Sequence, residues 1–306
     1  MRLFSKPKRN NASGILGIEF GPQGVAIAQV LRAPDSRPAL LSCDYLEGDP
    51  GRQAALLQQY VTENALGGLS ANVLLHPSEY QIFLLEAPDV QPQELRDAMR
   101  WRVKDMISSP LDEVVIDCFA LPDDAYRGRT RMVYCAVLEK TRMLRHAQIV
   151  GQAGLRMASI DITEMAFRNI GVLAGSAGIN LALLRLRTSE GLICIQNGTD
   201  LYMARRIEHG LARAAQDIGS LTLEIQRSLD YFESQLGKGY INRLMLLPMK
   251  QDEERTFQGL ASGLAVNVQR LDLRELFPGQ TAADLPEARQ AYCLGAVGAG
   301  LRQETD

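Results

Sequence analysis

The sequence has 306 residues and a formal net charge of -3, and its residues are 46% hydrophobic and 23% charged. This composition is that of an ordinary globular protein with a sizeable core, and the length favours two domains. The charge gives no general attraction to nucleic acid, and no run approaches the ~18–20 apolar residues that span a membrane. We therefore expect a globular protein without a nucleic-acid partner.

Basic residues are concentrated at the N-terminus. Arg2, Lys6, Lys8 and Arg9 lie within the first ten residues, with no acid among them. They are consistent with a solvated tail, or with weak attraction to an anionic membrane surface at roughly 1 kcal/mol per residue. No apolar segment accompanies them, as it would in a signal peptide. We expect a cytoplasmic protein that associates with a membrane only peripherally.

The cysteines and histidines give no sign of a disulfide framework or a zinc site. The five cysteines are odd in number, and no two of them form a C-x-x-C pair. They are Cys43, Cys118, Cys135, Cys194 and Cys293. Because most lie in apolar surroundings, we interpret them as reduced core residues, which indicates the cytoplasm. His76, His146 and His209 are isolated from one another, so no metal site is expected.

Turn signals divide the first half into short strands and helices. Gly21-Pro22-Gln23 separates two β-rich runs, and Gly67-Gly68 ends a segment whose apolar residues have helical spacing. The predicted elements are strands at 14–20, 24–32 and 38–43, a helix at 52–66, strands at 72–76 and 81–85, a helix at 92–106, strands at 114–120 and 131–138, a helix at 141–152 and a strand at 156–160. This order is typical of a mixed α/β sheet.

The predicted helix at 92–106 carries one apolar stripe. Leu95, Met99, Val103 and Met106 recur at helical spacing. The stripe is consistent with simple core packing. It is also consistent with a methionine-lined groove for a partner peptide, because methionine is flexible and polarizable.

The pattern begins again in the second half. Asn197-Gly198 is a strong hairpin signal between the second and third of three closely spaced strands. The predicted elements are a helix at 163–173, strands at 180–186, 191–196 and 200–207, a helix at 218–236, a strand at 243–247, a helix at 252–260, a strand at 265–269 and a helix at 287–301. Two units of three strands, helix, strand, helix and strand indicate a duplication of topology, without a repeat of the residues themselves.

The opening segment from Ile15 to Val30 is the most informative one. Its first strand ends in the acid-x-Gly sequence Glu19-Phe20-Gly21, and Gly24 opens the next strand. Glycines in such a turn let backbone N–H groups approach nucleotide phosphates, and a carboxylate there holds a metal-bound water. An ordinary hairpin with a glycine turn has the same pattern, so this segment alone leaves both interpretations open.

Blocks spread over roughly residues 3–302 resemble one family. The more specific blocks are Pro110-Leu111-Asp112-Glu113-Val114 and Glu224-Ile225-Gln226-Arg227-Ser228-Leu229-Asp230-Tyr231-Phe232, and the weaker ones include Arg100-Trp101, Ala153-Gly154-Leu155, Asn197-Gly198 and Tyr292-Cys293-Leu294-Gly295-Ala296. Together with the opening turn, they resemble the PilM family of type IV pilus assembly proteins, and most of all its members in the MSHA pilus system.

The resemblance implies a fold and a division of the chain. The fold is α/β and actin-like: a duplicated, ribonuclease H-like two-domain fold with a small inserted subdomain. The first domain would span residues 1–161, with the insert at about 85–150. The second would span residues 162–306, with the helix at 287–301 packing back on the first.

The resemblance also implies partners. A PilM-like protein captures the cytoplasmic N-terminal segment of a PilN-like bitopic inner-membrane protein, and so connects it to the motor and platform proteins of the pilus. The groove would lie between the first subdomain and the insert. We therefore expect Trp101, Arg102 and Met106 to contact the partner segment.

The family's nucleotide-binding residues are replaced at three places. The first turn offers Gly17, Glu19, Gly21, Gln23 and Gly24, but no lysine or hydroxyl, and Pro22 removes one backbone N–H donor. An Asp-x-Gly sequence is expected near Asn180 and is absent. The adenosine-side glycine pair is expected near residue 247, where the chain reads Leu247-Pro248-Met249. The resemblance therefore predicts a degenerate nucleotide turn, with no catalytic residue, no metal and no ATP or magnesium cofactor.

Other functions remain as alternatives. A functional actin-like ATPase or sugar-kinase-like enzyme would need a carboxylate at the second phosphate turn. A filament-forming cell-division scaffold would need an amphipathic C-terminal helix, which the tail at 302–306 lacks. Asp112, Glu113 and Asp117 could act as paired carboxylates, but a solvated loop explains them as well. Arg205-Arg206 could bind an anion, although in a strand one of the two points outward.

Overall fold

The computed structural model describes residues 13–32, 36–128, 130–250, 253–277, 279 and 284–303. The basic residues Arg2, Lys6, Lys8 and Arg9 and the C-terminal residues 304–306 lie outside this part of the chain. No helix within it is both long and apolar enough to cross a membrane.

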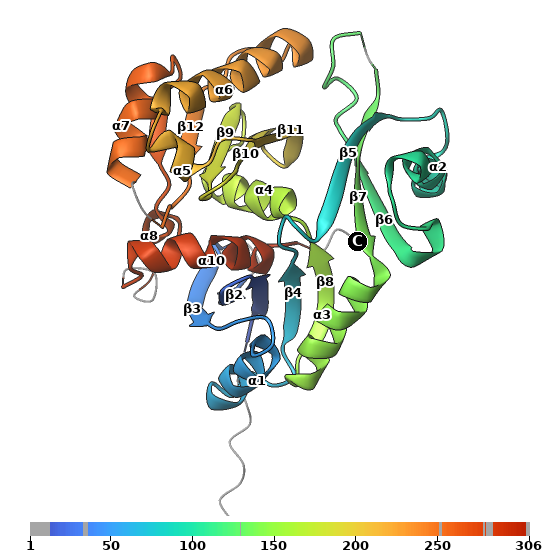
Figure 1. The fold of residues 1–306 in the computed structure, drawn as a ribbon, viewed down its shortest axis with the longest axis vertical. Helices are drawn as coiled ribbons and strands as arrows, with labels where there is room; N and C mark the ends of the chain where they lie inside the picture. The colour runs from blue at the N-terminus through green and yellow to red at the C-terminus, as the bar shows by residue number, and fades with distance from the viewer. Residues whose placement is uncertain are drawn as a thin grey trace, which may run out of the picture.

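The first five-stranded sheet is built mainly from the N-terminal part of the chain. Its strands are β1 (Ile15–Gly21), β2 (Gly24–Leu31), β3 (Ala39–Glu47), β4 (Ser70–Leu74) and β8 (Arg156–Asp161), in the order β3-β2-β1-β4-β8. β1 is antiparallel to β2 and parallel to β4. Helices α1 (Gln53–Glu63) and α3 (Lys140–Gln152) pack against each other in the lower half of Figure 1. α1 also contacts β2, and α3 contacts β8.

The second five-stranded sheet repeats this arrangement. Its strands are β9 (Leu181–Leu186), β10 (Gly191–Asn197), β11 (Asp200–Ile207), β12 (Arg243–Leu246) and β13 (Val268–Arg270), in the order β11-β10-β9-β12-β13. The helices on this side are α5 (Leu211–Ala214), α6 (Ile218–Tyr231) and α7 (Glu253–Gly263), followed by α8 (Leu273–Leu276). The identical strand order confirms the predicted duplication of topology.

Two helices lie between the sheets. α10 (Glu287–Gly300) packs on β1, β2, β3 and β4 and against α4 (Thr163–Leu173), which contacts the second sheet (Figure 1). Glycines allow α10 to approach closely, since a Cβ on Gly17 would lie 1.8 Å from the carbonyl oxygen of Ala296. A Cβ on Gly298 would lie 2.5 Å from the carbonyl oxygen of Ala166. Around these helices, one apolar cluster contains buried residues of both five-stranded sheets and so joins the two halves.

A three-stranded sheet forms a separate layer at the side of the molecule. It contains β5 (Tyr80–Glu86), β7 (Met132–Glu139) and β6 (Val114–Ala120), in the order β5-β7-β6. α2 (Leu95–Val103) covers it and is flanked by the single turns η1 (Pro92–Glu94), η2 (Lys104–Met106) and η3 (Leu111–Glu113). Met99 and Val103 are fully buried against this sheet, whereas Met106 is 47% exposed. The apolar stripe is therefore core over its first part and exposed at its end. The predicted domain boundaries stay a prediction.

Two further predictions can be compared with the structure. The helix predicted at 218–236 is α-helical to Tyr231 and continues as a π-helical segment, η4 (Phe232–Leu236), before Gly237 ends it in the left-handed conformation. Four of the five cysteines are buried, as expected for core residues. Cys118 is only partly buried and faces Cys135 across β6 and β7, with 3.0 Å between their sulfur atoms.

Candidate functional site

Two hairpin turns from equivalent strands meet at the centre of the molecule. In the first sheet Gly21 pairs with Gly24, and Pro22-Gln23 forms the turn. In the second, the N–H of Arg187 donates to the carbonyl of Glu190 at 2.7 Å, which leaves Thr188-Ser189 as the turn. Counting back from these turns, Arg185 of β9 occupies the position that Glu19 has in β1.

This equivalence corrects one prediction. The second phosphate turn was expected near Asn180, but Asn180 lies at the other end of β9, where its side chain donates to the carbonyls of Lys238 and Tyr240. The equivalent turn follows the strand and begins at Arg187. It contains no Asp-x-Gly sequence, and the residues in place of one are Arg185-Leu186-Arg187.

The two turns line a cavity of about 330 Å³, here called the central cavity. Of the residues predicted for the nucleotide turn, Glu19, Gly21, Gln23 and Gly24 line it. Gly17 does not, because it lies in the middle of β1 against α10. The other lining residues are Pro22, Ala26, Tyr45, His76, Arg185, Leu186, Arg187, Thr188, Ser189, Glu190, Leu211, Pro248, Met249, Lys250, Ala291 and Tyr292.

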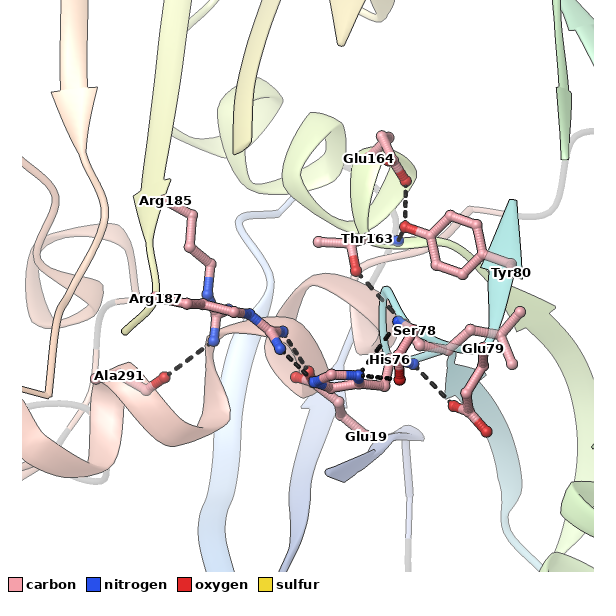
Figure 2. A network of polar contacts seen from close by, with 11 residues as sticks. Glu19, His76, Ser78, Glu79, Tyr80, Thr163, Glu164, Arg185, Arg187 and Ala291 are labelled. Atoms are coloured by element: carbon pink, nitrogen blue, oxygen red, sulfur yellow. Dashed lines mark hydrogen bonds and ion pairs between the residues drawn. The ribbon is translucent and has the colours of Figure 1, made fainter. Parts of the chain in front are cut away.

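A chain of polar contacts crosses the molecule beside this cavity (Figure 2). Arg187 donates to Glu19 Oε1 at 3.2 Å, and it also contacts Nε2 of His76. The backbone N–H of His76 donates to Glu79 at 2.9 Å, and Glu79 in turn contacts His146 of α3 at 2.8 Å. Burial, followed by the charge of Arg187, lowers the pKa of His76. A neutral His76 can accept the hydrogen bond from Arg187.

Cationic groups dominate the wall of the central cavity. Arg185 is buried, and its Nη1 has no hydrogen-bond partner, while Nη2 lies 3.5 Å from the carbonyl of Ala291. Burial and the nearby Arg187 lower the pKa of Arg185 to about 10. The Lys250 ammonium lies 3.8 Å from the ring centre of Tyr292, and burial and Arg185 lower its pKa too.

The residues of the cavity do not fit a magnesium–nucleotide complex. Magnesium prefers carboxylate oxygens, but Arg185 occupies the place of a second carboxylate. Glu19 already pairs with Arg187 through one oxygen. Its other oxygen lies against Gly295 of α10, since a Cβ on that glycine would be only 2.1 Å from it. Within the ranges that the structure describes, no group of three or more His, Cys, Asp or Glu side chains is arranged to hold a metal ion.

A second surface, here called the edge-strand groove, lies between β5 and β11. It is a cavity of about 500 Å³ lined by Tyr80–Leu84, Met106, Tyr134, Glu164, Leu192, Ala204 and Arg205-Arg206. β5 is an edge strand of the three-stranded sheet, and β11 is an edge strand of the second five-stranded sheet. Tyr134 of β7 connects the two sheets, because its hydroxyl accepts from the N–H of Ala204 in β11 at 2.9 Å.

Only one of the three residues predicted to contact a partner lines the edge-strand groove. Met106 lines the edge-strand groove, whereas Trp101 and Arg102 are not among its lining residues and lie exposed on α2. Arg102 donates to the carbonyl of Glu86 at 2.9 Å. The edge-strand groove lies between the three-stranded sheet and the second five-stranded sheet. The groove predicted from the sequence, between the first subdomain and the insert, stays a prediction.

Polar contacts connect the start of β5 and the strand β11 to neighbouring segments. Tyr80 donates to Glu164 of α4 at 2.6 Å, and it accepts from the N–H of Thr163 at 3.3 Å (Figure 2). Burial raises the pKa of both Tyr80 and Glu164. Arg206 of β11 donates to the carbonyl of Pro77 at 2.9 Å. The first two contacts connect β5 to α4, and the third connects β11 to the segment just before β5.

No known family model and no curated protein matches the sequence, but solved structures match the fold. One, described as a PilM-PilN type IV pilus biogenesis complex, is 18% identical and covers 96% of this chain and 100% of its own, with a TM-score of 0.72. Another, a protein of Bacteroides thetaiotaomicron with an actin-like ATPase fold and unknown function, is 11% identical. It covers 85% of this chain and 91% of its own, with a TM-score of 0.53.

This chain has an actin-like fold. The predicted fold class, a duplicated α/β architecture with a small additional unit, is confirmed. The three-stranded sheet is that unit, since the two five-stranded sheets account for the duplication.

Within this actin-like fold, the cations of the central cavity are the residues that sequence reasoning missed. The first turn has no lysine of its own, but Lys250 reaches the cavity from the segment after β12. Arg185 and Arg187 alternate at the end of a strand whose other residues are apolar, and residues two apart in a strand point to the same face. That spacing was the available signal for a pair of cations on one side of β9.

Proposed function

We propose that this protein is a scaffold of a type IV pilus assembly complex. In this role it holds the cytoplasmic N-terminal segment of a PilN-like bitopic inner-membrane protein. The observation that supports the proposal best is the match to the PilM-PilN complex over 96% of this chain and the whole of the matched chain. The sequence blocks quoted above favour the MSHA pilus, and within it a role like that of MshI.

The edge-strand groove is the surface we assign to the partner segment. Strand edges carry unpaired backbone groups, and extended peptides bind such edges by adding a strand. The N–H of Ala204 points away from β10, since it donates to Tyr134. Backbone groups in an antiparallel strand alternate, so those of Arg206 point the same way. An incoming segment could therefore pair with β11 while its side chains contact β5.

The side chains of the groove indicate the chemistry of the segment. Ile82, Leu84 and the half-exposed Met106 offer an apolar contact, and Arg205 and Arg206 are exposed beside it. A matching segment has one or two apolar side chains and an acidic residue near them. Methionine suits such a contact because it adapts to the shape of its partner.

Capture of the partner segment tests this proposal. The probe is a fluorescent peptide with the N-terminal cytoplasmic sequence of the PilN-like protein of the same pilus system, and its binding to the full chain is followed by anisotropy. We expect Met106→Ala to raise the dissociation constant about five- to tenfold, equivalent to about 1–1.4 kcal/mol. Trp101→Ala and Arg102→Ala are matched controls on α2, outside the groove. Unchanged binding by Met106→Ala would overturn the assignment, and a loss only in the α2 variants would move the site there.

We further propose that the scaffold acts without ATP hydrolysis, at the inner membrane and through its partner. The support is chemical: the place of a second metal-binding carboxylate is taken by Arg185, and Glu19 is paired with Arg187. The segment with Arg2, Lys6, Lys8 and Arg9 would add weak attraction to an anionic membrane. Phosphate release from magnesium-ATP, measured with and without the partner peptide, tests the first part. Sustained turnover in either case would contradict it.

A further inference from the structure

The central cavity holds more positive charge than its own acids neutralise. Arg185, Arg187 and Lys250 line it, and its acidic lining residues are Glu19 and Glu190. Arg187 is engaged by Glu19. Arg185 and Lys250 instead contact aromatic rings, those of Phe167 and Tyr292. Two cations therefore face the cavity without an ion-pair partner among the contacts that the structure gives them.

Arg185 is the decisive residue. It is 8% exposed, and its Nη1 has no hydrogen-bond partner although the side chain lines the cavity. A buried charge is costly unless it is paired and hydrogen-bonded. An anion in the cavity would supply both the charge and the acceptor that this guanidinium lacks.

We propose that the central cavity binds a phosphate-bearing anion directly through Arg185, Arg187 and Lys250, without a magnesium ion. The guanidinium groups suit phosphate because their N–H groups match two phosphate oxygens at once. Lys250 contributes a point charge from the segment after β12. The hydroxyls of Thr188 and Ser189, in the turn after Arg187, also line the cavity and can donate to the anion.

This arrangement replaces a bound cation by fixed ones. Arg185 occupies in β9 the position of Glu19 in β1, where a second carboxylate would help to hold a metal. A guanidinium there supplies positive charge to phosphate oxygens by itself. The cavity of about 330 Å³ lies near the lower end of the roughly 300–1,000 Å³ that small-molecule sites occupy. The ligand is therefore a compact one, such as a pyrophosphate group, either free or at the end of a nucleotide.

Binding of pyrophosphate to the full chain in the presence of EDTA tests the inference, by calorimetry and by thermal shift. We expect binding and an upward shift of the melting temperature without metal. Arg187→Gln and Lys250→Gln should each raise the dissociation constant about tenfold or more, because each removes a charge-assisted contact. Arg227→Gln, at an exposed position on α6 outside both cavities, is the matched control and should bind as the wild type does.

The source of the phosphate group is distinguished by ADP under the same conditions. Equal affinities for ADP and pyrophosphate would identify the phosphate group as the whole ligand, and tighter binding of ADP would identify a metal-free nucleotide. Either result supports the inference. Absence of binding by both probes at low ionic strength would overturn it. A strict requirement for magnesium, or full binding by both Gln variants, would overturn it as well. These binding measurements do not involve the partner segment, so this inference can fail while the proposed scaffold function stands.

Discussion

The two hairpin turns of the central cavity occupy equivalent places in two sheets of identical strand order, yet they carry opposite charges. β1 brings Glu19 to the cavity, and β9 brings Arg185 and Arg187. The backbone topology has been repeated, whereas the side chains that decide recognition have not. Duplication therefore predicts where a site lies, and the individual side chains decide what it binds.

The same two strands also differ where they meet their helices. Gly17 of β1 corresponds to Leu183 of β9 by the count from the turns. Gly17 lies against the backbone of α10, but Leu183 is a fully buried apolar side chain. The glycine of β1 is thus explained by close helix packing. It does not line the central cavity, so its presence in the opening segment is no evidence for phosphate binding.

The largest expected effect is on stability, from adding a side chain at Gly17, where β1 meets α10. We predict that Gly17→Ala lowers the free energy of unfolding by about 2–3 kcal/mol, as overpacking of a core does, because the new Cβ would meet the Ala296 carbonyl. Denaturant unfolding of the full chain measures it. Gly21→Ala is the matched control in the same strand, since the nearest atom to its Cβ is 3.6 Å away. Equal destabilisation by both variants would contradict the packing explanation.

The architecture could be predicted because its signals are local. Glycine turns, the Asn197-Gly198 hairpin and the spacing of apolar residues marked most strands and helices within a few residues of their observed bounds. The regularity of the two halves then gave the duplication. Short elements without strong periodicity, such as α5 and α8, were missed because four residues contain about one helical turn.

The site could be predicted only in part, because it depends on contacts between distant residues. Glu19, Gly21 and Gly24 were placed at the cavity by a motif within one hairpin. Arg185 and Lys250 join them only through the packing of the two sheets. The second turn was expected at Asn180, the wrong end of its strand, since no repeat of residues fixed the alignment of the halves. The groove beside Met106 likewise requires two strand edges from different sheets to meet.

A second, smaller effect should appear in the pH dependence of stability. Burial and Arg187, the cation that β9 adds to this site, lower the pKa of His76. The folded protein therefore binds this proton more weakly than the unfolded chain does. As pH falls below about 6.5, the free energy of unfolding should decrease, by at most about 1.4 kcal/mol per pH unit, until the lowered pKa is reached.

His76→Asn isolates this contribution. We expect its stability, measured by denaturant unfolding between pH 5.5 and 8, to fall less steeply than that of the wild type below about pH 6.5. Above pH 7.5 the two curves should run parallel, because His76 is then neutral in both the folded and the unfolded chain. Curves that stay parallel over the whole range would show that His76 does not titrate as the contact with Arg187 implies.

The smallest expected effect concerns the two turns themselves, Pro22-Gln23 and Thr188-Ser189. Proline limits the freedom of the unfolded chain, so Pro22→Ala should destabilise the protein by about 0.4–1 kcal/mol, detectable as a small drop in melting temperature. Pro22→Ala also restores the backbone N–H that proline lacks, which allows a test of nucleotide binding. We predict that magnesium adds nothing to any thermal stabilisation of this variant by ATP, since Arg185 still occupies the place of a second carboxylate. Thr188→Ala, in the equivalent turn, is the control for loss of a turn residue without a new N–H. A magnesium-dependent shift in Pro22→Ala alone would mean that one missing donor, and not the charge contributed by β9, separates this cavity from a nucleotide site.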